Sequence, residues 1–91
     1  MADAIITIKI MPKNPEVNLE ELKQKIEVVV KKHNGEIGKY EIQPIAFGLK
    51  SLLIYIIRDE KLGTTDELEK EINNFEEVES CQVIDVRRAL G

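Results

Sequence analysis

The chain has 91 residues, of which 43% are hydrophobic, 33% are charged and 4% are aromatic. A chain of this length and composition is expected to form one folded globular domain rather than a disordered segment. The formal net charge of −4 argues against a general nucleic-acid binder, because such proteins need an excess of Lys and Arg at phosphates. It also argues against an anionic membrane surface as the main partner. We therefore expect a single domain over residues 1–91 that contacts neither nucleic acid nor membranes.

Features that would place the chain outside the cytoplasm are missing from the sequence. The single cysteine, Cys81, cannot form an internal disulfide and is expected to be a small buried side chain. The first residues lack the basic region and apolar stretch of a signal peptide. The longest apolar run, residues 52–57, is far too short to cross a bilayer. These observations predict a cytoplasmic protein.

The first half of the chain predicts a strand followed by a helix. Residues 4–10 place Ile6, Ile8 and Ile10 on one side, and this period of two is typical of a half-buried strand. After a proline-containing linker, Asn18 is suited to cap a helix over residues 19–33, in which apolar residues recur every three or four positions.

The second half predicts two strands, a helix and a final strand. Residues 37–42 are a weaker strand candidate, whereas residues 49–57 are apolar on both faces, which indicates a central strand. A helix is predicted over residues 65–75, with Thr64 as its N-cap and Glu67 completing a capping box. Residues 78–86 supply the last strand.

This βαββαβ order predicts an α+β fold of the ferredoxin-like type. Right-handed crossovers favour the strand order 4-1-3-2 in a four-stranded antiparallel sheet. Both helices are then expected on one face of that sheet.

Residues that could carry out covalent chemistry are sparse. The single histidine, His33, falls at the predicted end of the first helix, where a cation is favourable. The chain has no second His, no CxxC pair and no Gly-rich phosphate loop, so we expect neither a metal, nor a cofactor, nor enzymatic activity. A small-molecule-binding regulatory domain of the same fold stays open as an alternative, although such domains usually have a Gly-rich turn after the first strand.

Two segments are unusual for a solvated surface. The connection between the second and third predicted strands contains Ile45 and Phe47, whereas hairpin loops are normally polar. The core and the surface suit Ile45 equally, but Phe47 is expected to be exposed, as an aromatic interface anchor would be. Two of the three arginines also lie near the C-terminus. The predicted partner-binding residues are Pro44, Ile45, Ala46, Phe47, Gly48, Arg87 and Arg88.

Three segments, residues 44–50, 58–64 and 85–88, together resemble the archaeal translation elongation factor 1-beta family. They read PIAFGLK, RDEKLGT and DVRR, and the resemblance covers nearly the whole chain from Ile5 onward. It implies guanine-nucleotide exchange on elongation factor 1-alpha, the GTPase that carries aminoacyl-tRNA to the ribosome. It also implies a ferredoxin-like fold and a chain that is monomeric when free.

The resemblance bears on the arginines as well. Eukaryotic relatives place a lysine next to their last residue, near the magnesium site of the GTPase. This chain has Leu90 before Gly91, so Arg87 and Arg88 are the candidates for that role.

The predicted topology separates the two patches. Phe47 follows the second strand and the arginines follow the fourth, so they fall at opposite ends of the sheet, roughly 25 Å apart at about 3.3 Å per residue. No single small-molecule pocket could use both, but a multidomain GTPase could. A structural adaptor that binds such a GTPase without exchange activity stays open as a third reading.

Overall fold

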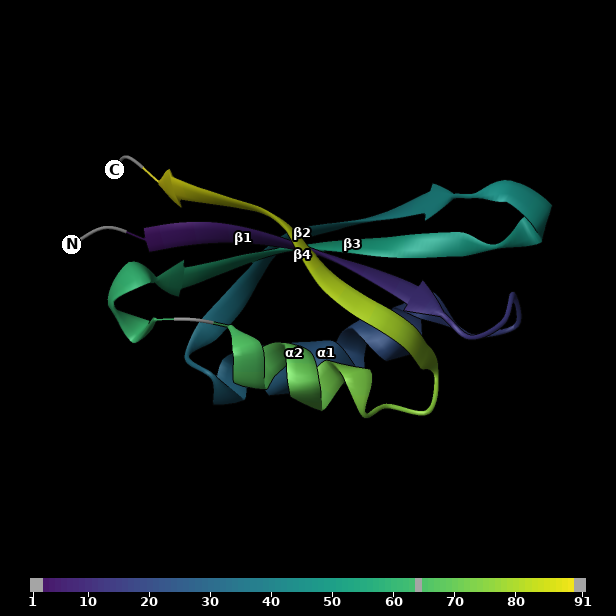
Figure 1. Cartoon of the computed structure of the whole chain (residues 1–91), viewed down its shortest axis with the longest axis horizontal. Coiled ribbons are helices and arrows are strands. Elements are labelled where there is room, and N and C mark those ends of the chain that lie inside the picture. Colours follow the sequence, from purple (N-terminus) through teal and green to yellow (C-terminus); the bar gives the residue numbers. More distant parts are fainter. Residues whose placement is uncertain (1–2, 64, 90–91) are drawn as a thin grey trace.

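A computed structural model describes residues 3–63 and 65–89 of the chain. Its strands and helices follow the order β1 (Asp3–Pro12), α1 (Leu19–Lys32), β2 (Gly35–Pro44), β3 (Lys50–Asp59), α2 (Asp66–Asn73) and β4 (Val78–Ala89). The four strands form one antiparallel sheet in the order β2-β3-β1-β4, which is the predicted order read from the other edge. Both helices lie on one face of this sheet, as predicted (Figure 1).

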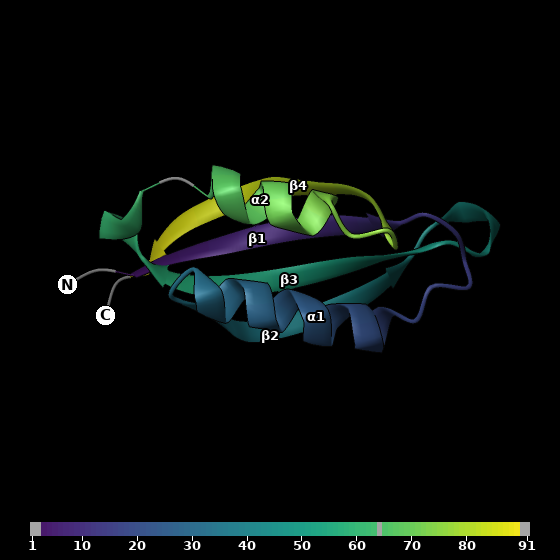
Figure 2. The same ribbon diagram turned by 90° about the horizontal axis from the view of Figure 1, so that it is seen from below.

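The core fills the space between the sheet and the two helices. Ile8 and Ile10 of β1 are fully buried there, as are Ile54 and Ile56 of β3. Viewed from the helical side, α1 and α2 lie next to each other and roughly along the strands of the sheet (Figure 2). The fully buried side chains of the helix layer are Leu22, Ile26, Val30, Leu68 and Ile72.

The prediction that the strand with apolar residues on both faces is central is confirmed, since β3 lies between β2 and β1. Leu53 is only 6% exposed although it lies on the face without helices. That face is covered in part by long side chains, since the Lys39 ammonium lies 4.5 Å from the centroid of the Tyr55 ring. Such contacts let a charged stem shield apolar surface while its head stays in water.

The start of α1 follows the prediction closely. The Asn18 side chain accepts hydrogen bonds from the backbone N–H groups of Glu20 and Glu21, at 3.0 and 3.2 Å. These bonds satisfy two donors that the first turn of a helix leaves without partners. At the other end, His33 occupies the C-cap, as its position in the sequence predicts.

The second helix is shorter than predicted. It spans Asp66–Asn73 rather than 65–75, and Phe75 packs against the core from the turn that follows. The helix ends early because the Asn73 side chain donates to the Cys81 carbonyl and accepts from the Cys81 N–H, which ties this point to β4. Its N-cap is Thr65, and Thr64, the predicted cap, lies outside the described residues.

Cys81 is buried, as expected, with 4% of its surface exposed. Burial raises the pKa of its thiol to about 12, so the side chain acts as a small hydrophobe at neutral pH.

Candidate functional site

The hairpin between β2 and β3 ends in a tight turn over residues 46–49. Phe47 has φ 61° and ψ 34°, and Gly48 has φ 77°. The Leu49 N–H donates to the Ala46 carbonyl at 3.3 Å, and the Ile45 N–H donates to the Leu49 carbonyl at 2.7 Å. Two residues in the left-handed conformation, closed by the hydrogen bond from Leu49 to Ala46, give the geometry of a type I′ turn. The twist of such a turn matches that of the flanking strands.

Phe47 is an exception to the chemistry of such turns. The position favours Gly, which has no Cβ, or Asn and Asp, whose short polar side chains tolerate positive φ, whereas a bulky side chain is strained there. Phe47 is also 97% exposed, so burial does not offset that strain. A strained backbone carrying an exposed aromatic ring points to a role in binding rather than in folding.

All five predicted loop residues are exposed. Phe47 is exposed, as predicted, and Ile45, for which the sequence favoured neither the core nor the surface, is 39% exposed. Pro44, Ala46 and Gly48 are exposed as well. The structure thus brings the five predicted loop residues together on one apolar tip.

A groove that the sequence did not predict adjoins this tip, and the polar residues Asn18, Glu20 and Lys50 are part of its lining. It has a volume of about 250 Å³ and lies between the β2–β3 hairpin and the start of α1. Ile42 and Gly48 line it on the hairpin side, and Pro15, Val17 and Leu19 line it on the other. The groove depends on the contact of two segments that are far apart in the sequence, so no local pattern could reveal it.

The arginines do not leave the sheet, and that part of the prediction is wrong. β4 continues to Ala89, so Arg87 is paired with Ile5 and Arg88 with Ala4 of β1. The last strand is longer than the predicted 78–86 because β1 itself begins at Asp3 and offers partners along its whole length. The arginines are therefore held on a strand.

Each arginine has an acidic neighbour. Arg87 Nε lies 2.9 Å from Asp85 Oδ2, and Arg88 donates to both carboxylate oxygens of Glu60, at 2.8 and 3.2 Å. The two arginine side chains are 78% and 65% exposed, respectively. Ion pairs in water contribute little, so both arginines can exchange these partners for a stronger anion at small cost.

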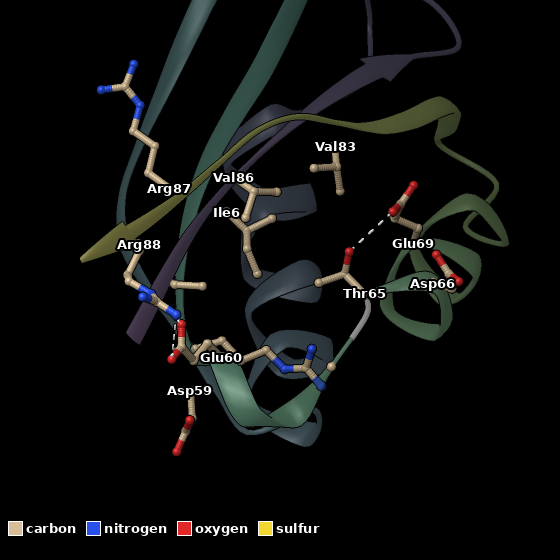
Figure 3. Close-up of a pocket in the computed structure, with 13 residues that line it drawn as sticks. Ile6, Asp59, Glu60, Thr65, Asp66, Glu69, Val83, Val86, Arg87 and Arg88 are labelled. Carbon is tan, nitrogen blue, oxygen red and sulfur yellow. Dashed lines mark hydrogen bonds and ion pairs between the residues drawn. The ribbon is translucent and has the colours of Figure 1, made fainter. Parts of the chain in front are cut away.

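A pocket of about 570 Å³ lies beside Arg88, between β4 and the start of α2 (Figure 3). Ala4, Ile6, Val83 and Val86 line its sheet side. Four carboxylates stand around the apolar surface, namely those of Asp59, Glu60, Asp66 and Glu69. Arg58, Arg87 and Arg88 line the pocket as well, so two of the predicted site residues border it.

The tip and the arginine end lie at opposite ends of the molecule, as the topology predicted. The β2–β3 turn and the C-terminal end of β4 mark the two ends of the long axis (Figure 1). That axis measures 42 Å, against 22 and 17 Å for the other two.

Within residues 3–63 and 65–89, no group of three or more His, Cys, Asp or Glu side chains is arranged to hold a metal ion. Among the helices described, none is long and apolar enough to span a bilayer.

Comparison with known proteins adds a family to this geometry. Residues 5–89 match the family described as "EF-1 guanine nucleotide exchange domain". The chain is 37% identical over 90 residues to "Elongation factor 1-beta" of Methanothermobacter thermautotrophicus, which covers 99% of this chain and 100% of the relative. It is 43% identical over 82 residues to the protein of the same name from Pyrococcus furiosus, with 89% of each chain covered.

Solved structures support the fold alone. The ACT domain of a GTP pyrophosphokinase from Chlorobium tepidum aligns with a TM-score of 0.60 and 14% identity, over 90% of this chain and 99% of that one. The designed protein Foldit4 aligns with a TM-score of 0.63 and 20% identity, over 98% of each chain. Such low identities indicate a shared arrangement of strands and helices and carry no function across.

Proposed function

The chain belongs to the family of EF-1 guanine nucleotide exchange domains, and we propose that it promotes the release of GDP from elongation factor 1-alpha during polypeptide elongation. Exchange of a nucleotide makes and breaks no covalent bond, which fits a chain with few chemically reactive residues. A factor that binds the empty GTPase more tightly than the GDP-bound form must weaken GDP binding by the same factor. The chain therefore needs binding surfaces rather than an active site.

The observation that carries the proposal is the exposed ring of Phe47. We propose that Phe47, with Pro44, Ile45, Ala46 and Gly48 around it, anchors the chain on the GTPase and supplies most of the affinity. The Phe47 side chain is 97% exposed in the free chain. A ring that is this exposed can bury a large apolar area at the centre of an interface when the complex forms. Since the turn already holds the ring outward, little conformational freedom is lost when the complex forms.

The opposite end is proposed to act on the nucleotide. Arg87 and Arg88 would compete for the phosphates or the acidic magnesium ligands of the GTPase, whose switch segments are its deformable part. Their present partners, Asp85 and Glu60, are exposed and readily exchanged. In this division, the Phe47 end supplies binding and the arginine end supplies the change in nucleotide affinity.

We propose for the chain the same domain organisation, location, oligomeric state and partner that the sequence predicts. Residues 1–91 act as one exchange domain in the cytoplasm, and the free chain is a monomer. Its partner is the GTPase, without direct contact to nucleic acid or membrane, since its acidic surface disfavours both.

A nucleotide-release assay tests the proposal directly. Elongation factor 1-alpha loaded with fluorescent GDP is mixed with increasing amounts of the chain in excess unlabelled nucleotide. We expect faster release that saturates as the complex fills. Release at the intrinsic rate despite measurable binding would instead indicate an adaptor, and absence of binding would favour the small-molecule domain.

Substitutions in the same assay test the division between the two ends. Because β4 pairs with β1 through Ala89, deleting the C-terminal residues would also damage the sheet, so single substitutions are the cleaner choice. We expect Arg87→Ala and Arg88→Ala to lower the saturated rate more than the affinity, and Phe47→Ala to do the reverse. Lys70→Ala, which removes an exposed cation of α2, serves as the control.

A further inference from the structure

The last part of β4 carries an apolar side chain that the helix layer leaves uncovered. Val86 is paired with Ile6 across β1 and β4. Ile6 is only 4% exposed and belongs to the core, whereas Val86 is 61% exposed. α2 begins only at Asp66, after the turn Glu60–Leu62, so it does not extend over this end of β4.

A bulge in β4 decides which side chains face this uncovered region. The register shifts between Ile8, paired with Val83, and Thr7, paired with Asp85, so that Ile84 has no partner in β1. In a regular strand, side chains three positions apart point to opposite faces. The extra residue brings Val83 and Val86 onto the same face, that of the pocket.

The far wall of the pocket is acidic. Asp66 and Glu69 stand on the first turn of α2, across from Val83 and Val86 (Figure 3). Glu69 accepts a 3.3 Å hydrogen bond from the Thr65 hydroxyl. The ion pairs of the described residues involve neither Asp66 nor Glu69.

Three arginines also line the pocket, but no ion pair of the described residues joins one of them to Asp66 or Glu69. Arg88 is held by Glu60 on the other side of the pocket, and the Arg87 side chain points away from it (Figure 3). Arg58 is only 9% exposed, and its Nε donates to the His33 carbonyl at 2.9 Å. An anionic group entering the pocket would meet two carboxylates next to apolar surface, where repulsion is poorly screened. A purely apolar side chain would displace water from those carboxylates without giving them a partner of opposite charge.

We propose that this pocket receives a lysine or arginine side chain of the GTPase, an inference that rests on the proposed function. The methylene stem of that side chain lies on Val83 and Val86, and its cationic head reaches Asp66 and Glu69. Long basic side chains combine these two parts and bury the stem while the head keeps a polar partner. The two arginines would contact anionic groups of the GTPase, whereas the pocket beside them would contact a cationic one. Two contacts of opposite charge fix how this end is oriented on its partner.

Paired variants test the charge. The pocket variant, Asp66→Asn/Glu69→Gln, removes both carboxylates of the acidic wall. The control variant, Glu67→Gln/Glu76→Gln, removes two exposed carboxylates that do not line the pocket, one in α2 and one shortly after it. We expect the pocket variant to bind purified elongation factor 1-alpha about fivefold or more weakly and to lose part of the salt dependence of binding. The control variant is expected to stay within about twofold of the unmodified chain.

A second pair tests the apolar surface. Val86→Ser and Val28→Ser change two exposed valines, one in the pocket and one on α1, which are 61% and 69% exposed. Only Val86→Ser is expected to weaken binding, by about threefold or more, because only this valine would be covered by the partner. Thermal unfolding of all variants identifies any effect that comes from the fold.

The outcomes separate this proposal from the proposed function. If the unmodified chain binds the GTPase and accelerates GDP release while both pocket variants match their controls, the pocket proposal is wrong and the exchange function stands. If the unmodified chain neither binds the GTPase nor accelerates GDP release from it, the proposed function itself fails. Weaker binding in the two pocket variants alone, with unchanged melting temperatures, supports the pocket proposal.

Discussion

At the scale of single residues, Phe47 shows a conflict between folding and function. Its φ of 61° places a bulky side chain in a backbone conformation that favours Gly or Asn, and its exposure provides no compensation from the core. Natural chains retain such strain chiefly where a binding site uses the result. The strained turn keeps the ring at the end of the hairpin instead of letting it fold back onto the sheet.

This leads to the first prediction. Phe47→Ala is expected to leave the free energy of unfolding within about 1 kcal/mol, because the ring makes no core contact. The same change is expected to weaken binding to elongation factor 1-alpha by about 2 kcal/mol or more, as for an interface anchor. Denaturant unfolding and titration calorimetry measure the two quantities. A large loss of stability would show that the ring supports the fold and is not an anchor.

At the scale of elements, Asn73 joins the end of α2 to β4. Its Nδ2 donates to the carbonyls of Glu69 and Cys81, at 2.9 and 3.3 Å, and its Oδ1 accepts from the Cys81 N–H at 2.9 Å. One side chain thus satisfies groups on two elements, including the backbone N–H of the buried Cys81.

The second prediction follows from these bonds. Asn73→Ala is expected to lower the free energy of unfolding by about 1–3 kcal/mol, because it leaves a partly buried N–H without its partner. The neighbouring change Asn74→Ala is the control, with an expected effect within about 0.5 kcal/mol. Urea unfolding of both variants decides between them, and equal effects would refute a special role for Asn73.

Glu71 links α2 to the end of α1 by ion pairs. Its carboxylate lies 3.1 Å from both Lys32 Nζ and His33 Nε2 at the end of α1. These hydrogen bonds, first that from Lys32 and then that from His33, lower the pKa of Glu71. A group whose pKa is lowered by folding stabilises the fold above its unfolded-state pKa, and this stabilisation disappears as the pH falls through the folded-state pKa.

The third prediction is therefore a pH dependence. At neutral pH the unmodified chain is expected to be more stable than Glu71→Gln. The difference should shrink once the pH falls below the ordinary glutamate range and vanish when Glu71 is protonated in both states. Denaturant unfolding at a series of pH values measures this, and a constant difference across the acidic range would rule out the ion pair as its cause.

At the scale of the whole molecule, the elongated shape keeps the two proposed contacts apart. The Phe47 turn and the arginine end occupy the two ends of the 42 Å axis, with the sheet between them (Figure 1). Sites that share no neighbours usually contribute independently to stability or binding. Such a chain can touch its partner at both ends, so that contacts at one end supply binding free energy while those at the other end act on the structure of the partner.

The fourth prediction tests this independence. The losses of binding free energy in Phe47→Ala and Arg88→Ala are expected to add in the double variant to within about 0.5 kcal/mol. Binding of the three variants to elongation factor 1-alpha, measured at one salt concentration, completes the cycle. An interaction energy well above that limit would indicate that both residues act on one region of the GTPase.

The sequence by itself was sufficient for the order of elements, the central place of β3 and the exposure of Phe47. These features depend on short-range patterns: a period of two in Ile6, Ile8 and Ile10, an N-cap at Asn18, and an aromatic residue between Pro44 and Gly48. Each pattern reports which way a side chain faces within a few residues, and chain connectivity then restricts the topology.

Only the tertiary structure decided where β4 ends, how the arginines are held and where the pocket lies. Arg87 and Arg88 belong to the sheet because β1 offers partners as far as Asp3, and Val86 faces the pocket because a bulge at Ile84 shifts the register. The left-handed turn at Phe47 likewise depends on the twist of the paired strands. All of these features follow from pairing and packing between segments that are distant in the sequence. Such contacts produce no pattern within a few neighbouring residues, so the local sequence does not reveal them.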